Sequence, residues 1–316
     1  MKKYKSVIIA VCVAVAVLAV GLIPTLISVF TVPEDTGNKS ARVPKDTDIV
    51  AEIYVDGAEE PYKTIQRSEF AYQFTHRGDT NIFRTDENLY EKDIRIEIRY
   101  DIDIGADELC IVTSPEHTVT VNGNGNKITG SDTSNPVLRV QSCSRGGNVV
   151  FHRMDLENTK ASCFQYYNEV TVDINDCEWT AKTHKVLLLT SSGTVNVNNR
   201  SVFRGYQPIY AQSTTENTVN IANGAEIIGS LDAITVKKGP VTFNVKGEVR
   251  SSCAGGRAFF AEAAAENVTV NVDGGIFKGD ISADSGTTLN LMSGRLAGLL
   301  LCDNATVNQS EYFMIG

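Results

Sequence analysis

One short pattern recurs along most of this chain and limits the folds that the chain can adopt. Its clearest copy is Thr-Val-Asn-Ile at 218–221, followed by the turn residues Asn223-Gly224 and by a second apolar run at 227–229. Because side chains alternate between the two faces of a strand, the aliphatic residues of the first run face one side and Asn220 faces the other. Copies of the pattern are centred on Asn122, Asp173, Asn196, Asn220, Asn244, Asn271, Asn290 and Asn308.

Each copy supplies three short strands, because a third apolar run such as 234–236 follows the second one in most copies. Between Asn122 and Asn308 lie 186 residues, and a degenerate copy at 149–152 divides them into eight intervals of about 23 residues. Helical solenoids and leucine-rich repeats need other periodicities, which are not present. The expected fold class is therefore all-β, a single-stranded parallel β-helix built of three-strand coils.

Over about residues 94–316 the repeat resembles the right-handed parallel β-helix of the pectate-lyase-like superfamily. The interval varies between 18 and 27 residues, whereas left-handed β-helices repeat at one fixed length. The resemblance implies a polysaccharide lyase or a glycoside hydrolase. The polygalacturonase-like motifs of that superfamily, among them Asn-x-Asp, paired aspartates and Gly-His-Gly, have no counterpart in this chain.

No spacing in the chain groups residues that would perform such chemistry. Glycoside hydrolysis needs two carboxylates roughly 5–10 Å apart, and lyase chemistry needs acids that hold Ca²⁺ together with a base. Asp173, Asp176 and Glu178 are close in sequence, but solvated acids on one outward face explain them. The remaining candidates are scattered turn acids (Asp232, Asp273, Asp280, Asp284) and four histidines in different coils (His76, His117, His152, His184). We expect no catalytic residue, no metal site and no cofactor.

The outward asparagines are the candidate binding residues. Stacked about 4.8 Å apart, they predict a ladder of side-chain amides, each bonded to the next coil. The functional alternative is an amide-rich face that binds sugar hydroxyls. Three basic residues each lie one or two positions before the Gly or Ser that ends the second apolar run. They predict a basic stripe on the neighbouring face. This stripe would either bind an acidic polymer or be only a solvated surface. The candidates are Asn196, Asn220, Asn244, Asn271, Asn290, Arg204, Arg250 and Lys278.

Residues 1–30 predict a transmembrane signal-anchor. Three lysines precede an apolar run at 7–30, whose 24 residues rise roughly 36 Å as a helix. The positive flank places the N-terminus in the cytoplasm and the rest of the chain outside. The alternative is a signal peptide cleaved after Ala14-Val15-Ala16, which would release a secreted protein. Residues 31–48 lack periodicity and predict a linker.

Residues 49–93 depart from the repeat and predict an N-terminal cap. A strand at 49–55 and a weakly amphipathic helical stretch from Tyr62 to Phe74 would cover the open hydrogen-bonding end of the β-helix. Isoleucines then alternate with polar residues from Ile94 to Ile104, which predicts a strand over these eleven residues. The β-helix is expected to run over 94–316.

Composition excludes some partners. Outside the anchor, 26 basic residues face 38 acidic ones, a net charge of −12, which disfavours nucleic acid and anionic membrane surfaces. The six cysteines outside the anchor show no metal-ligand spacing and are expected to fill the coil interior, and a disulfide between Cys143 and Cys163 stays open.

Together these observations favour a membrane-anchored, extracytoplasmic surface protein that binds glycan or a neighbouring surface without catalysis. The alternatives are an enzyme of the pectate-lyase-like type and a structural spacer without a ligand.

The last coil, which reaches Gly316, generates a prediction about self-association. An uncapped coil exposes unpaired N–H and C=O groups above an apolar core, so we expect either a continuation of the chain or end-to-end pairing with a second copy. Sedimentation of residues 31–316 tests this expectation. A monomer at micromolar concentration with slow amide exchange through 305–313 would refute it.

Overall fold

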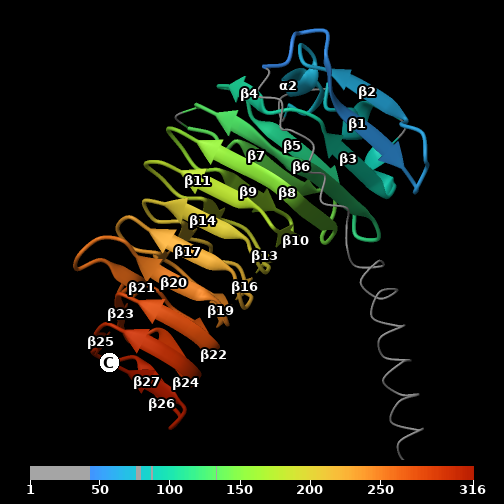
Figure 1. Ribbon diagram of the computed structural model, residues 1–316. Coiled ribbons are helices and arrows are strands. Elements are labelled where there is room, and N and C mark those ends of the chain that lie inside the picture. Colours follow the sequence, from blue (N-terminus) through green and yellow to red (C-terminus); the bar gives the residue numbers. More distant parts are fainter. Residues whose placement is uncertain (1–42, 76–79, 87, 133) are drawn as a thin grey trace, which may run out of the picture. The chain divides into compact units, whose positions relative to one another are not determined.

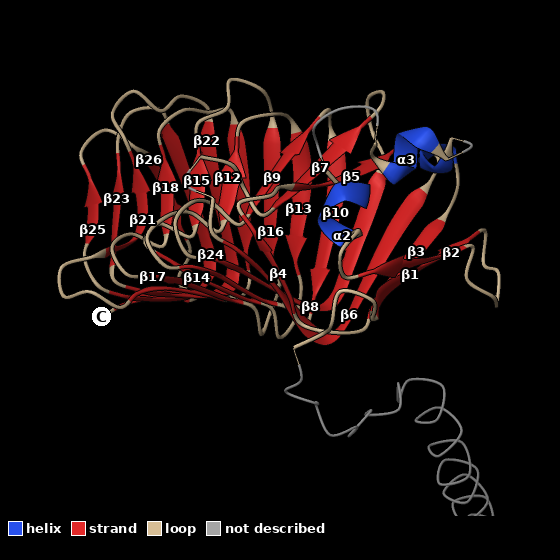
Figure 2. Cartoon of the chain, turned by 90° about the horizontal axis from the view of Figure 1, so that it is seen from above, coloured by secondary structure: helices blue, strands red, loops and turns tan. Residues whose placement is uncertain are grey.

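The computed structural model describes residues 43–75, 80–86, 88–132 and 134–316. These residues form a right-handed parallel β-solenoid with very little helix, which confirms the coarse fold predicted from the repeat. Three strands follow one another in each coil, and successive coils pair in parallel, so the strands form three stacks (Figures 1 and 2). The predicted membrane segment at 1–30 and most of the predicted linker lie outside the described residues. Within the described ranges, no helix is both long and apolar enough to cross a bilayer.

The first two stacks belong to one continuous sheet, because four long strands bend from one stack into the other. These four are β6 (Thr118–Gly130), β8 (Asn148–Asn158), β22 (Val268–Lys278) and β24 (Thr287–Ala297). The first stack also contains β3 (Ile94–Ile98), β10 (Val170–Asn175), β13 (Gly193–Val197), β16 (Asn217–Ile221), β19 (Val241–Val245) and β26 (Thr306–Gln309). The second also contains β4 (Ile102–Gly105), β11 (Glu178–Ala181), β14 (Val202–Gly205), β17 (Glu226–Gly229), β20 (Glu248–Ser251) and β27 (Phe313–Ile315).

The third stack is a separate sheet on the other side of the core. Its strands are β5 (Leu109–Thr113), β7 (Leu138–Ser142), β9 (Phe164–Tyr167), β12 (Leu187–Leu189), β15 (Ile209–Ala211), β18 (Ile234–Val236), β21 (Arg257–Ala261), β23 (Asp280–Ala283) and β25 (Leu300–Cys302).

The predicted corner between the first and second strands of the repeat is present. Gly224 adopts a φ of +80° there, a conformation that residues with a Cβ seldom take. A Cβ on Gly224 would also lie 2.1 Å from Oδ1 of Asn199 in the preceding coil. The glycine is therefore needed for its backbone angle, whereas the exposed Asn199 side chain could move away from a Cβ.

The segment before the first coil pairs with one strand at the N-terminal end of the solenoid, and its role as a cap stays a prediction. β1 (Ile49–Val55) pairs antiparallel with β3 and with β2 (Lys63–Gln66), so the first coil meets β1 at its edge. The helical stretch predicted from Tyr62 to Phe74 is wrong in part: it is a strand at β2, and only α2 (Phe70–Gln73) is helical. Pairing with β1 overrides the local helical pattern. Two further short elements complete the segment, α3 (Ile82–Thr85) and the 3₁₀-helix η1 (Leu89–Glu91).

Two details of the predicted repeat need correction. The strand predicted from Ile94 to Ile104 is divided into β3 and β4, because the corner between the first two stacks falls at 99–101. The copy centred on Asn122 is out of register with the later copies. Asp173 pairs with Val150, and Val150 pairs with Thr120, so Thr120 lies in the column of Asp173. Asn122 pairs with His152 instead. The irregular corner between Asn122 and Asn126 in β6 lengthens this coil. The degenerate copy at 149–152 is part of β8, as predicted.

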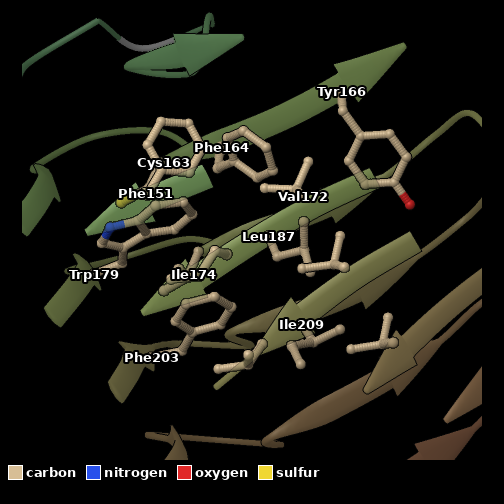
Figure 3. Close-up of a cluster of buried hydrophobic side chains, with 14 of the residues drawn as sticks. Phe151, Cys163, Phe164, Tyr166, Val172, Ile174, Trp179, Leu187, Phe203 and Ile209 are labelled. Carbon is tan, nitrogen blue, oxygen red and sulfur yellow. The ribbon is translucent and has the colours of Figure 1, made fainter. Parts of the chain in front are cut away.

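Apolar side chains fill the space between the stacks in columns that repeat from coil to coil. Trp179 stacks on Phe203 of the next coil with ring centroids 5.4 Å apart and an interplanar angle of 5°. Phe151 and Phe164 pack edge-on or tilted against Trp179, and Figure 3 shows this cluster. The indole N–H donates to the backbone oxygen of Met154 at 2.9 Å, so the buried polar atom is satisfied.

The cysteines divide into two groups. Cys110, Cys163 and Cys177 are buried, as predicted, and burial raises the pKa of each thiol, to about 12 for Cys110 and Cys177. Cys143 and Cys253 are exposed and Cys302 is half-buried, so the prediction that all six fill the coil interior is wrong for these three. All six described cysteines are free, and the pair left open in the sequence, Cys143 and Cys163, is not bonded: Cys163 is buried and Cys143 is exposed.

The final coil within the described residues has strands that pair on one side only. β25 pairs with β23, and both β26 and β27 pair with β24. The predicted association at this end stays a prediction.

The stacked ring pair generates a stability prediction. Phe203→Ala removes a fully buried ring and should lower the free energy of unfolding by about 3–5 kcal/mol. Because Trp179 is the only tryptophan, its fluorescence should also shift as water reaches the cavity. The matched control is Tyr206→Ala, whose ring is exposed and whose loss should cost little. Equal losses in the two variants would contradict the assigned interior.

Candidate functional site

The predicted asparagines form one unbroken ladder on the outward face of the first stack. In every step the Nδ2 group donates to the side-chain oxygen of the preceding coil. The ladder runs through Asp173, Asn196, Asn220, Asn244, Asn271, Asn290 and Asn308, with donor–acceptor distances of 2.6, 2.6, 2.7, 2.8, 2.8 and 2.8 Å. The structure thus brings together all five predicted binding asparagines.

The ladder follows from parallel pairing in register. Asn196, Asn220 and Asn244 are direct partners of one another across successive strands, at the spacing of adjacent strands. A side-chain amide has two N–H donors and an oxygen with two lone pairs. Because the ladder uses one donor and one acceptor site of each interior member, one N–H and one lone pair remain for solvent or a ligand. The structural role of the column therefore leaves part of each amide available.

An open groove borders the central part of the ladder. It has a volume of about 440 Å³, and three ladder residues line it together with residues of the following corner. Lys246 and Asp273 place one charge of each sign at its wall. The lining residues are Asn220, Ile221, Ala222, Asn244, Val245, Lys246, Asn271 and Asp273.

The three predicted basic residues occupy one outward column of the second stack. Arg204 pairs in register with Ile228, Ile228 with Arg250, and Arg250 with Lys278, so an isoleucine interrupts the stripe. Each cation has an acidic partner. Arg204 lies 3.0 Å from Glu178, and Glu248 lies 3.3 Å from Arg250 and 2.7 Å from Lys278. The stripe is therefore balanced in charge rather than uniformly basic.

The same column continues toward the N-terminus with an acid between two lysines. Glu157, which pairs in register with Thr180, accepts from Lys182 at 2.7 Å and from Lys127 at 3.1 Å. The hydrogen bond from Lys182, supported by the one from Lys127, holds the pKa of Glu157 below its ordinary value. Paired charges along this face lower its attraction for a polyanion.

The acids and histidines considered in the sequence do not converge. Asp173 begins the ladder, Asp176 lies 3.5 Å from Arg200, and Glu178 pairs with Arg204. His117 lies 3.8 Å from Asp93, and burial lowers the pKa of His184. His76 lies outside the described residues. In the part of the chain that the structure describes, no group of three or more His, Cys, Asp or Glu side chains is placed to hold a metal ion.

Sequence reasoning missed an ion pair with a buried acid beside the third stack. Asp232, expected to be a scattered turn acid, is 1% exposed and receives two hydrogen bonds from Arg257, at 2.8 and 2.9 Å. The guanidinium also lies 3.4 Å from the ring centroid of Phe260. Removing Arg257, whose side chain is 31% exposed, would leave the buried Asp232 carboxylate without its cation. No local sequence pattern marks it, because its members are 25 residues apart.

Comparisons of the chain with protein-family models, with curated proteins and with solved structures found no match in any of the three.

The assignment of faces in the repeat can be tested by substitutions at adjacent residues. Ile221→Asp places a carboxylate at a position that is 1% exposed and should cost at least about 4 kcal/mol of stability or prevent folding. Asn220→Ala removes two ladder hydrogen bonds at a half-buried position and should cost about 1–2 kcal/mol. Thermal unfolding measures both, and comparable losses would mean that the faces are reversed.

Proposed function

We propose that this protein is a membrane-anchored, extracytoplasmic β-helix that binds glycan on the asparagine face of its first stack and does not catalyse a reaction. The apolar run at 7–30, the lysines before it and the acidic residues after it support the anchor and its orientation. The coil of three strands supports a likeness to the pectate-lyase-like β-helices, extended here to the fold and not to their chemistry.

One observation carries the proposed binding role. The ladder holds its amides in fixed orientations and leaves an N–H and a carbonyl lone pair on each interior amide, and three of these amides, Asn220, Asn244 and Asn271, line an open groove. Sugar hydroxyls both donate and accept hydrogen bonds, so they complement such paired groups. Because the amides are already ordered by the ladder, a ligand would lose little additional side-chain entropy on binding.

The basic column supports a secondary contact only. Arg204 and Arg250 line an open groove of about 360 Å³ over Ile228, but their acidic partners would have to be displaced by an acidic ligand. We therefore assign the main contact to Asn196, Asn220, Asn244, Asn271 and Asn290, and a peripheral one to Arg204, Arg250 and Lys278.

The proposal is tested with a glycan array and a triple variant. Changing Asn220, Asn244 and Asn271 to Ala should abolish binding to the glycans that the wild-type protein selects, while the circular dichroism of β-structure persists. The matched control changes Asn198, which donates to Asn175 in a separate pair of amides at 2.8 Å, to Ala. Binding should survive in this control.

Three outcomes would contradict the proposal. If the triple variant loses both its fold and its binding, the ladder has only a structural role. New reducing ends or unsaturated products on incubation with a bound glycan would favour an enzyme. Absence of binding to every glycan on the array would favour a spacer.

A further inference from the structure

A column of threonines lies beside the asparagine ladder on the same outward face. Each threonine stands two residues before a ladder residue, so both point to the same side of the strand. Parallel pairing places each threonine directly against the threonine of the next coil. The column contains Thr171, Thr194, Thr218, Thr242, Thr269, Thr288 and Thr306. We call these seven threonines and the seven ladder residues the threonine–asparagine face.

The hydroxyls of this column are available for a ligand. Thr306 is exposed and the other six threonines are half-buried. The described part of the chain provides no hydrogen-bond partner for any of the seven hydroxyls. Each hydroxyl can donate one hydrogen bond and accept two. Because threonine is β-branched, its χ1 is restricted, so each hydroxyl has few orientations to lose on binding.

The charge of the face selects among polymers. Asp173 is the only ionisable residue of the fourteen, and the residues outside the predicted anchor carry a net charge of −12. An anionic polymer such as a polyuronate would be repelled. The face also has no aromatic ring on which a single sugar could stack. Its recognition therefore depends on many weak hydrogen bonds to uncharged hydroxyl groups.

The spacing of the face selects the shape and direction of the ligand. Equivalent groups recur about every 4.8 Å from coil to coil, and the two columns are separated by roughly 6.6 Å along each strand. Seven coils present the same pair of groups over roughly 29 Å along the solenoid. A ligand that uses all of them must be extended, must repeat, and must lie across the strands.

We infer that the ligand is an unbranched, uncharged polysaccharide that lies along the solenoid axis, with successive sugar units over successive coils of the threonine–asparagine face. This inference rests on the proposed function and specifies its ligand. Each coil contributes a small, similar increment, so affinity rises with chain length through linked contacts. Short oligosaccharides of the same sugar bind weakly.

The experiment compares short and long members of neutral, unbranched series on the full-length protein in a detergent without a sugar headgroup. The probes are the disaccharide and the hexasaccharide of the cello-, manno-, xylo- and chito-oligosaccharide series, with hexagalacturonate as an acidic probe. In at least one neutral series the hexasaccharide should bind at least tenfold more tightly than the disaccharide. Hexagalacturonate should bind more weakly than that hexasaccharide.

A triple variant separates the threonines from the asparagines. Changing Thr218, Thr242 and Thr269 to Val removes three hydroxyls, keeps the β-branched shape and leaves the ladder intact. It should weaken binding of the selected hexasaccharide at least about tenfold. The matched control changes Thr64, Thr129 and Thr183, which lie outside the face, to Val and should bind as the wild type does.

The outcomes distinguish this inference from the proposed function. If the array identifies a glycan but none of the four neutral series binds, or if binding is independent of chain length, the inference is overturned and glycan binding stands. The same conclusion follows if the threonine variant binds as well as the control. If no glycan binds at all, the proposed function itself fails.

Discussion

The whole structure depends on parallel hydrogen bonding between coils that keeps equivalent residues in register. This pairing places each repeat position directly over the same position of the neighbouring coil. A residue type that recurs at one position of the repeat therefore forms a column that runs from coil to coil. Inside, the columns include the stacked rings of Trp179 and Phe203, and outside they become the amide ladder. Columns of like charge would repel, and the second stack avoids this by placing Glu248 beside Arg250 and Lys278.

The repeat made the fold predictable because two of its constraints act locally. Alternation along a strand identifies the inward side of runs such as 218–221, and the asparagine and glycine at 223–224 mark the corner. Register is a long-range property. In β6 the motif at Asn122 resembles the later copies, but Thr120, two residues earlier, lies in the register of the ladder column through Val150. A short motif cannot reveal such a shift.

The candidate site likewise combines features that a local pattern predicts with features that depend on long-range contacts. The ladder could be predicted because its members repeat, and the threonine column could have been found by the same alternation, since Thr-x-Asn recurs from Thr194 onward. The Asp232–Arg257 pair could not, because its residues meet only when the coils stack. Likewise, the sequence of β2 does not distinguish a strand from a helix, because β2 is a strand through its pairing with β1.

The ladder also has a direction. Every amide donates toward the N-terminal coil, and every amide except Asn308 accepts from the C-terminal one, so the side-chain dipoles align along the face. The donor ends point to Asp173, whose carboxylate accepts the last hydrogen bond. A negative charge there is favoured for the same reason that it is favoured at the N-terminus of a helix. The surface thus has a direction along its length as well as a period. A chain molecule whose two ends differ would meet a different order of donors and acceptors in each of its two orientations.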